Sequence, residues 1–118
     1  MRLDQWVKTD LQKDIWHKKY QHNNETFDDW TDRVSGGNKK IKRLIEDKKF
    51  LFGGRILANR GIDDKKISLN NCFVMESPED SIDGIYEVAH DIAKTFSRGG
   101  GCGVNISSLS PKGAKINN

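Results

Sequence analysis

The sequence has little of several features that would define its class at once. Its 118 residues include only two cysteines and two prolines, and hydrophobic residues make up 35%. No apolar run is long enough to cross a bilayer, and residues 1–4 do not resemble a signal peptide. Two cysteines cannot make a disulfide scaffold, so we expect free or catalytic thiols. These absences favour a cytoplasmic protein without a membrane partner.

Charge and histidine content exclude two further classes. The net charge of +3 is too small to indicate a nucleic-acid partner, so scattered surface lysines are the better interpretation. His17, His22 and His90 show no metal-ligand spacing with one another or with the cysteines, so we expect no metal site. A charged fraction of 31% beside few apolar residues leaves two readings open. The chain is partly disordered, or a partner completes its core.

Residues 1–49 have the periodicity of short helices. Val7, Leu11 and Ile15 recur every four residues, which predicts one helix over residues 4–20 with an apolar stripe. The three tryptophans are expected to pack in the core. A platform for stacking bases is the alternative, but no basic stripe surrounds them.

Two further helices are expected before residue 50. Thr26 and a carboxylate three residues later resemble a capping box, which predicts a helix start. Residues 35–38 end this helix, and a short basic helix follows them. The side chains expected to face inward are Phe27, Trp30, Val34, Ile41, Leu44 and Ile45.

Two apolar runs in the middle of the chain favour strands. The run 50–57 contains paired glycines, which usually mark a bend or a close approach of backbone. Arg55 lies in this apolar run, and it either reaches water or binds an anion. The run 67–75 alternates imperfectly, which predicts a largely buried strand that carries Cys72.

The clearest helix is expected from about residue 81 to residue 96. Asp80 or Ser81 can cap it, and Gly99 is a natural stop. Its expected apolar face comprises Ile82, Ile85, Val88 or Ala89, Ile92, Ala93 and Phe96. The glycine run that follows lacks the Gly-Lys-Ser/Thr of a P-loop and enters a strand, expected at 103–106. Such a run either brings bare backbone against a ligand or is only a tight turn.

Five short motifs in order then form a resemblance. They are Gly-Gly-Arg-Ile-Leu-Ala, Asn-Asn-Cys-Phe-Val, Glu-Asp-Ser-Ile-Asp-Gly-Ile, Gly-Gly-Gly-Cys-Gly-Val-Asn and Ser-Pro-Lys-Gly-Ala. In order and spacing they resemble the catalytic chain of ribonucleotide reductases, most closely the adenosylcobalamin-dependent class II. The similarity covers roughly residues 50–118. Residues 1–49 resemble only loosely the helical segment that precedes the barrel of that family.

The resemblance implies an α/β fold that is incomplete on its own. Residues 1–49 would be a helical N-terminal segment. Residues 50–118 would be the first strands and helix of a ten-stranded α/β barrel, ending in the first specificity loop. The radical cysteine and the second reducing cysteine would lie beyond residue 118. Either a second polypeptide completes the barrel, or this chain is a shortened one.

The resemblance also implies roles at the substrate. The family reduces the 2′-hydroxyl of a ribonucleotide by thiyl-radical chemistry, and two cysteines supply the electrons and become a disulfide. In the resemblance, Cys72 matches the first cysteine of that pair. The chemistry fits this role, because a thiol at a strand end can be held against a sugar. Asn71, Gly101 and, less closely, Arg55 match positions at the substrate. Cys102 is expected to be a packing residue.

A second set of residues matches the site for a specificity effector, a deoxynucleoside triphosphate bound between subunits. Asp80, Ser81 and Ile82 match the start of the helix that holds it, and the carboxylate would accept a bond from the deoxyribose hydroxyl. Many relatives have arginine where Ser110 stands, so Lys112 or Lys115 would have to contact the effector phosphates.

The expected cofactor and partners follow from the same resemblance. Adenosylcobalamin would be bound mainly by the part of the barrel outside this chain. Expected partners are a C-terminal reductase polypeptide, a second copy of the catalytic unit in a homodimer, the ribonucleotide substrate and a thioredoxin-like or dithiol reductant. Two alternatives remain open from the residues alone: a stand-alone deoxynucleotide-binding regulatory module, and a structural interaction domain without catalysis.

Overall fold

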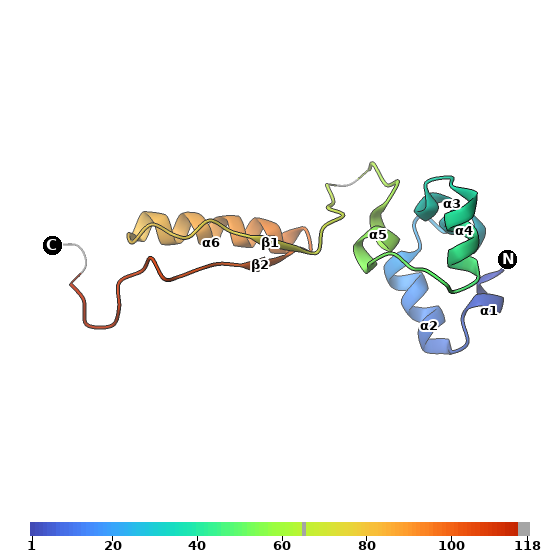
Figure 1. The fold of residues 1–118 in the computed structure, drawn as a ribbon, viewed down its shortest axis with the longest axis horizontal. Coiled ribbons are helices and arrows are strands. Elements are labelled where there is room, and N and C mark those ends of the chain that lie inside the picture. Colours follow the sequence, from blue (N-terminus) through green and yellow to red (C-terminus); the bar gives the residue numbers. More distant parts are fainter. Residues whose placement is uncertain (65, 116–118) are drawn as a thin grey trace. The chain divides into compact units, whose positions relative to one another are not determined.

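The computed structural model describes residues 1–64 and 66–115. The chain forms two compact units, residues 1–69 and 70–118 (Figure 1). The division therefore falls after residue 69 rather than after residue 49, where the sequence predicted it. The reason is that α5 (Gly54–Asn59) is helical and packs on the helical turn η1 (Trp16–Tyr20), which makes residues 50–69 part of the first unit.

The first unit is helical in its described residues. Its elements in chain order are α1 (Leu3–Trp6), α2 (Asp10–Ile15), the π-helix η1 (Trp16–Tyr20), α3 (Phe27–Ser35), α4 (Lys39–Glu46) and α5 (Gly54–Asn59). The closest packing between separate helices is that of α3 on α4. The unit has one core, and the buried residues of this core come from η1, α3, α4 and α5.

The prediction of one continuous helix over residues 4–20 was wrong. Val7 ends α1 with an extended backbone, and Thr9 is extended too while its hydroxyl accepts a hydrogen bond from Gln12 N at 3.2 Å. A threonine that caps a new helix start stops the preceding helix from continuing. The expected stripe is broken as a result, and the Leu11 side chain is 67% exposed.

The capping box at α3 was predicted correctly. Thr26 Oγ1 accepts from Asp29 N at 3.1 Å, and Thr26 N donates to the Asp29 carboxylate at 3.1 Å. The helix ends at Gly36, whose φ of 64° is in the left-handed region that glycine adopts without strain. The inward face of α3, made by Phe27, Trp30 and Val34, is buried as expected.

The basic helix α4 also exists, with Asn38 as its N-cap. Ile45 is fully buried, and Ile41 packs against the core. Leu44 was expected to face inward, but it is 40% exposed. With eight residues and a core on one side, α4 can bury only a narrow stripe, and Leu44 lies beside that stripe.

The tryptophans belong to the core, as predicted. Trp16, Phe27, Trp30, Val34, Ile45 and Leu57 form the buried cluster, and Trp6 packs against it. The Trp6 and Trp30 rings lie 6.0 Å apart in an edge-on arrangement. Trp6 Nε1 donates to Ile45 O at 2.9 Å, and Trp30 Nε1 donates to Leu57 O at 3.1 Å. These indole donors tie α1 to α4 and α3 to α5, and each of the two bonds avoids the cost of an unpaired N–H.

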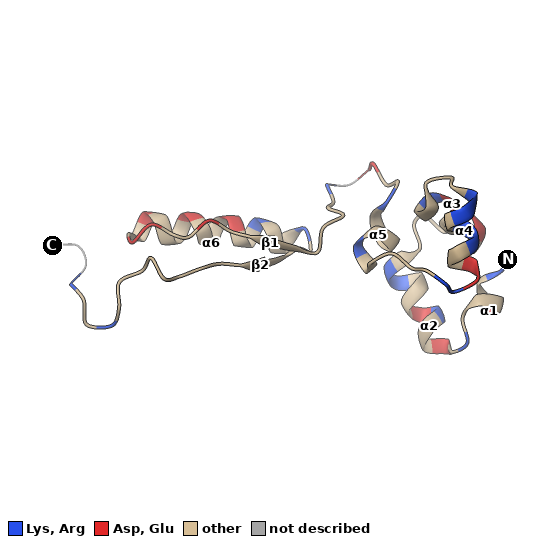
Figure 2. Cartoon of the chain, in the orientation of Figure 1, with Lys and Arg blue, Asp and Glu red and all other residues tan. Residues whose placement is uncertain are grey.

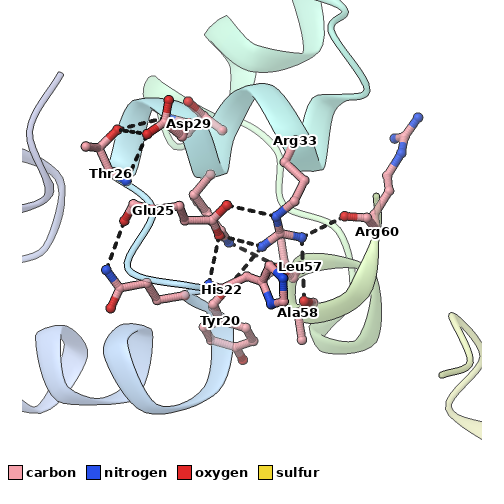
Figure 3. A network of polar contacts seen from close by, with 12 residues as sticks. Tyr20, His22, Glu25, Thr26, Asp29, Arg33, Leu57, Ala58 and Arg60 are labelled. Atoms are coloured by element: carbon pink, nitrogen blue, oxygen red, sulfur yellow. Dashed lines mark hydrogen bonds and ion pairs between the residues drawn. The ribbon is translucent and has the colours of Figure 1, made fainter. Parts of the chain in front are cut away.

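A half-buried arginine joins three segments of the first unit (Figure 3). The Arg33 guanidinium donates to both oxygens of the Glu25 carboxylate, at 3.0 and 2.7 Å. It also donates to Arg60 O at 2.6 Å and to Tyr20 O at 3.1 Å. The planar guanidinium suits such a convergence of acceptors. It therefore fixes the ends of η1 and α5 against α3.

The predicted strand over residues 50–57 was wrong, because residues 54–59 are the helix α5. Gly53 is the extended N-cap, and the Arg-Ile-Leu-Ala sequence after it consists largely of residues that favour helix. Leu57 is the buried residue of this helix. The paired glycines therefore mark a helix start instead of a bend in a strand.

The second unit contains a short parallel sheet and one long helix. In chain order they are β1 (Cys72–Val74), α6 (Ile82–Ser97) and β2 (Gly101–Gly103). The strands pair in parallel, with Cys72 opposite Gly101, and α6 lies alongside them (Figure 1). This is a β-α-β crossover, the building unit of α/β folds. The α/β class was thus predicted correctly for this unit.

Both strands differ from their predicted bounds. The run 67–75 is paired only at 72–74, and its exposed Cys72 and Val74 contradict the prediction of a largely buried strand. The second strand lies within the glycine run, at 101–103, and not at 103–106. Glycines weaken a strand in isolation, but here their backbone groups pair with β1, as in the bond from Met75 N to Gly103 O of 2.8 Å.

The helix α6 begins where the sequence predicted, with Ser81 accepting from Gly84 N at 3.0 Å. Its acidic residues lie toward the N-terminal end and a lysine lies near the C-terminal end (Figure 2), which matches the helix dipole. The expected apolar face is wrong in part, since only a stripe of Gly84, Val88, Ile92 and Thr95 is buried or half-buried. The parallel stripe of Ile82, Ile85, Ala89, Ala93 and Phe96 is exposed; we call it the open stripe of α6. None of the described helices is long and apolar enough to span a membrane.

Candidate active site around Cys72

The thiol of Cys72 lies at the start of β1, beside the glycine run. Gly101 is its partner on β2, and Gly101 N donates to Asn71 O at 2.8 Å. A Cβ atom at position 101 would lie 3.7 Å from Cys72 Sγ and 3.6 Å from Asn71 O. Glycine therefore leaves an open space of about one methyl group next to the thiol. Cys72 is exposed, so a ligand on this face of the sheet can reach it.

The two cysteines lie on opposite faces of the sheet. Side chains alternate along a strand, and paired residues share a face, so Cys72 lies with Gly101 and Cys102 lies with Phe73. The Phe73 ring and the Thr95 methyl group of α6 both approach Gly100, which places the Phe73 face toward α6. Cys102 is half-buried on that face. The thiols cannot form a disulfide with each other without breaking the strand register, which supports a packing role for Cys102.

The predicted effector residues lie at the other end of α6. Ser81 is committed to capping the helix, Ile82 is 59% exposed in the open stripe, and Lys112 is exposed. The Asp80 carboxylate accepts a hydrogen bond from Ser110 N at 3.1 Å and another, very short one, from the Ser110 hydroxyl. These two bonds lower the pKa of Asp80 below its ordinary value, because they stabilise the ionised form. The structure thus brings Asp80 to Ser110, a pairing that the sequence did not predict.

A cavity of about 380 Å³ lies between β1 and α6. The charged residues of its lining are all acidic, namely Glu76, Glu79, Glu87 and Asp91. Sequence reasoning missed this group, although Glu87 and Asp91 are spaced four apart on one helix and could have indicated it. Carboxylates repel phosphate, so this cavity does not suit a nucleotide phosphate.

Arg55 belongs to the first unit, half-buried in α5. Within the described ranges, its guanidinium makes no hydrogen bond or ion pair with another side chain. In the same ranges, no group of three histidine, cysteine or acidic side chains is arranged to hold a metal ion.

A thiol on an open sheet face, beside a glycine that exposes the backbone, defines a thiol-bearing α/β site. Residues 70–118, which contain it, match the family model described as the barrel domain of ribonucleotide reductase. For residues 70–118 the resemblance to ribonucleotide reductases is confirmed, and this segment coincides with the second structural unit.

Two curated relatives agree with this match. The chain is 32% identical over 82 residues to the ribonucleoside-diphosphate reductase large chain of Neurospora crassa, covering 64% of the chain and 9% of that protein. It is 33% identical over 73 residues to the protein of the same name from Cryptosporidium parvum, covering 62% of the chain and 9% of that protein. The chain thus spans about a tenth of the length of these relatives.

Proposed function

We propose that this chain forms the first part of the barrel of a ribonucleotide reductase, in which Cys72 is one of the two reducing thiols. The observation that carries the proposal is the exposed Cys72 thiol beside Gly101, inside the segment that matches the reductase barrel domain. The relatives are named as reductases of ribonucleoside diphosphates, which favours a diphosphate substrate. A cytoplasmic location stays a prediction.

The proposed reaction requires two thiols. Reduction of the ribonucleotide 2′-carbon takes two electrons and two protons, the hydroxyl leaves as water, and two thiols become one disulfide. Cys72 supplies one thiol, and the second is expected on the rest of the barrel together with the radical cysteine. Cys102 is unsuited to that role because it lies on the opposite face. A dithiol or thioredoxin-like protein would then reduce the disulfide by exchange.

The substrate would lie on the Cys72 face of the sheet. The Gly101 position allows the sugar to approach, since no side chain fills the space beside the thiol. Asn71 is exposed next to the thiol and carries both a donor and an acceptor for a nucleotide hydroxyl. Arg55 is proposed as a phosphate contact on the strength of its motif alone.

The remainder of the barrel would complete this unit. A parallel sheet is usually covered on both faces and extended at both edges, whereas β1 and β2 have three residues each. The open stripe of α6 and the 92% exposed Val74 present apolar surface that a neighbouring layer would bury. We propose that a polypeptide segment of reductase sequence covers this surface and that the completed unit is a homodimer.

The proposal includes two further ligands, an effector and a cofactor. A deoxynucleoside triphosphate effector would use Asp80, Ser81 and Ile82 at the N-terminal end of α6, together with the exposed Lys112. Adenosylcobalamin is proposed because the motifs most closely resemble those of class II reductases. The acidic cavity beside α6 does not fit a cofactor that carries phosphate, so we assign cobalamin to the rest of the barrel and derive no step from it.

The test compares two matched substitutions in the intact reductase that contains this chain. Cys72→Ser is expected to abolish turnover with a dithiol reductant while nucleotide binding persists, and Cys102→Ser is expected to retain turnover. Loss of turnover in Cys102→Ser alone would refute the assignment. Thermal shifts with each deoxynucleoside triphosphate identify the alternative, a regulatory module that binds nucleotides without catalysis.

A further inference from the structure

Three hydrogen bonds tie the segment after β2 to the N-terminal end of α6. Ser108 Oγ donates to Pro78 O at 2.6 Å. Ser110 N donates to one oxygen of the Asp80 carboxylate at 3.1 Å, and the Ser110 hydroxyl donates to the other oxygen. The bonded residues are thirty positions apart in sequence. They form a clasp, by which we mean the contacts of Ser108 and Ser110 with Pro78 and Asp80.

The clasp is not needed to start α6. Ser81 caps the helix by accepting from Gly84 N, so the Asp80 carboxylate is free of that task. Instead, each of its oxygens accepts one bond from Ser110. A carboxylate offers two acceptor oxygens, and Ser110 supplies one donor to each of them from within the chain.

We propose that Ser110 is a specificity-determining residue that acts as an internal ligand of Asp80, so that a nucleotide hydroxyl must displace the Ser110 hydroxyl to bind there. The inference rests on the proposed function, which gives Asp80 an effector role. A sugar hydroxyl and the serine hydroxyl are the same kind of donor and compete for the same carboxylate oxygen. The effector would be a deoxynucleoside triphosphate, whose phosphates need a cation such as the exposed Lys112.

Displacement would also move the segment that follows β2. When the Ser110 amide and hydroxyl leave Asp80, the bond from Ser108 Oγ to Pro78 O is the remaining described side-chain contact of this segment with this end of α6. In this proposal the bound nucleotide and the contact of Ser110 with Asp80 exclude each other. A ligand can shift such an equilibrium only by its preference for one state.

Removing the internal donor should strengthen nucleotide binding. In Ser110→Ala the Asp80 carboxylate has no hydroxyl competitor, and one ordinary hydrogen bond corresponds to a roughly three- to tenfold gain in affinity. Asp80→Ala removes the ligand contact itself, so it should weaken binding below that of the unmodified protein. Ser107→Ala is the matched control, because Ser107 is exposed and its amide, not its hydroxyl, makes the described contact, with Asn105.

The experiment measures equilibrium binding of each deoxynucleoside triphosphate to the intact reductase and its three variants, with hydrogen exchange of residues 105–113. We expect tighter binding in Ser110→Ala only, and faster exchange of the Ser110 amide in the unmodified protein when nucleotide is bound. Binding that is equal in the unmodified protein and Ser110→Ala, with unchanged exchange, overturns the inference and leaves the reductase proposal intact. If no nucleotide binds to any variant, the effector part of the proposed function fails, and this inference fails with it.

Discussion

Two adjacent glycines of the second unit should respond in opposite ways to the same added methyl group. A Cβ at Gly101 would lie 3.6–3.7 Å from Asn71 O and Cys72 Sγ, which is ordinary contact. A Cβ at Gly100 would lie 2.8 Å from a Phe73 ring carbon and 2.8 Å from the Thr95 methyl carbon. Neither glycine has a positive φ that would strain an alanine. Gly100→Ala thus tests packing, and Gly101→Ala tests access to the thiol.

The expected magnitudes follow from these distances. At position 100 the methyl is caught between β1 and α6, so neighbouring groups must move, and such overpacking costs about 1–3 kcal/mol. At position 101 the methyl fits, and the loss of glycine freedom in the unfolded chain favours the folded state by about 0.4–1 kcal/mol. The same methyl covers the side of Cys72 on which a sugar would lie. Gly101→Ala should therefore keep stability and lose turnover.

Denaturant unfolding measures the first effect, and the rate of Cys72 modification by a bulky thiol reagent, together with turnover, measures the second. Thr95→Ser removes one of the two clashing carbons and keeps the hydroxyl bond to Asp91 O, so it should restore part of the stability lost in Gly100→Ala. A Gly101→Ala variant with full turnover would refute the placement of substrate beside Cys72. A Gly100→Ala variant as stable as the unmodified protein would refute the described packing of β1 on α6.

Further predictions concern the helical unit and the contrast between units. Ile45→Ala should cost about 2–5 kcal/mol, because Ile45 is fully buried, whereas Leu44→Ala at an exposed neighbour should stay within about 0.5 kcal/mol, both by denaturant unfolding. Thr26→Ala should cost about 1 kcal/mol through loss of the cap. The bonds from the Thr26 hydroxyl and amide lower the pKa of Asp29, so its contribution to stability is present above the unfolded pKa of about 3.9 and is lost as the pH falls through the lower folded pKa. Thr26→Ala removes the hydroxyl bond and keeps the amide bond, so it should reduce this acid dependence in a pH series of unfolding curves. In hydrogen exchange, the amides of α3 and α4 should be better protected than those of α6, and equal protection would contradict the difference in burial.

The local signals of the sequence predicted helix starts well. The caps at Thr26 and Ser81 depend on a hydroxyl and the backbone three residues later, so a window of a few residues contains all the information. The tryptophan core was also predicted, since large aromatic side chains without a basic surround have no other favourable place. The caps join residues that are close together in sequence, and the burial of the tryptophans has one dominant physical outcome.

The failures have a different origin. The apolar run at 50–57 could form a strand or a helix, and its contacts with η1, more than thirty residues earlier, decide for α5. Likewise, β1 and β2 are strands only where they pair, so their ends depend on a partner segment that no local pattern contains. The contact of Asp80 with Ser110 was missed for the same reason, because thirty residues separate them. Contacts between residues far apart in sequence therefore determine the part of the candidate site that the motifs did not predict.

The two units differ in how far their described residues account for their own stability. In the first, six buried side chains form one cluster, and the Trp30 indole and the Arg33 guanidinium donate to backbone acceptors around it. In the second, Gly84 and Pro78 are the buried residues of 70–115, while the open stripe of α6 and Val74 remain in water. An apolar stripe of this kind stabilises an α/β unit only when another layer covers it. The face that carries Cys72 also carries Val74, so the layer that buries Val74 must come close to the thiol. Completing the fold and enclosing the candidate site would therefore be the same event.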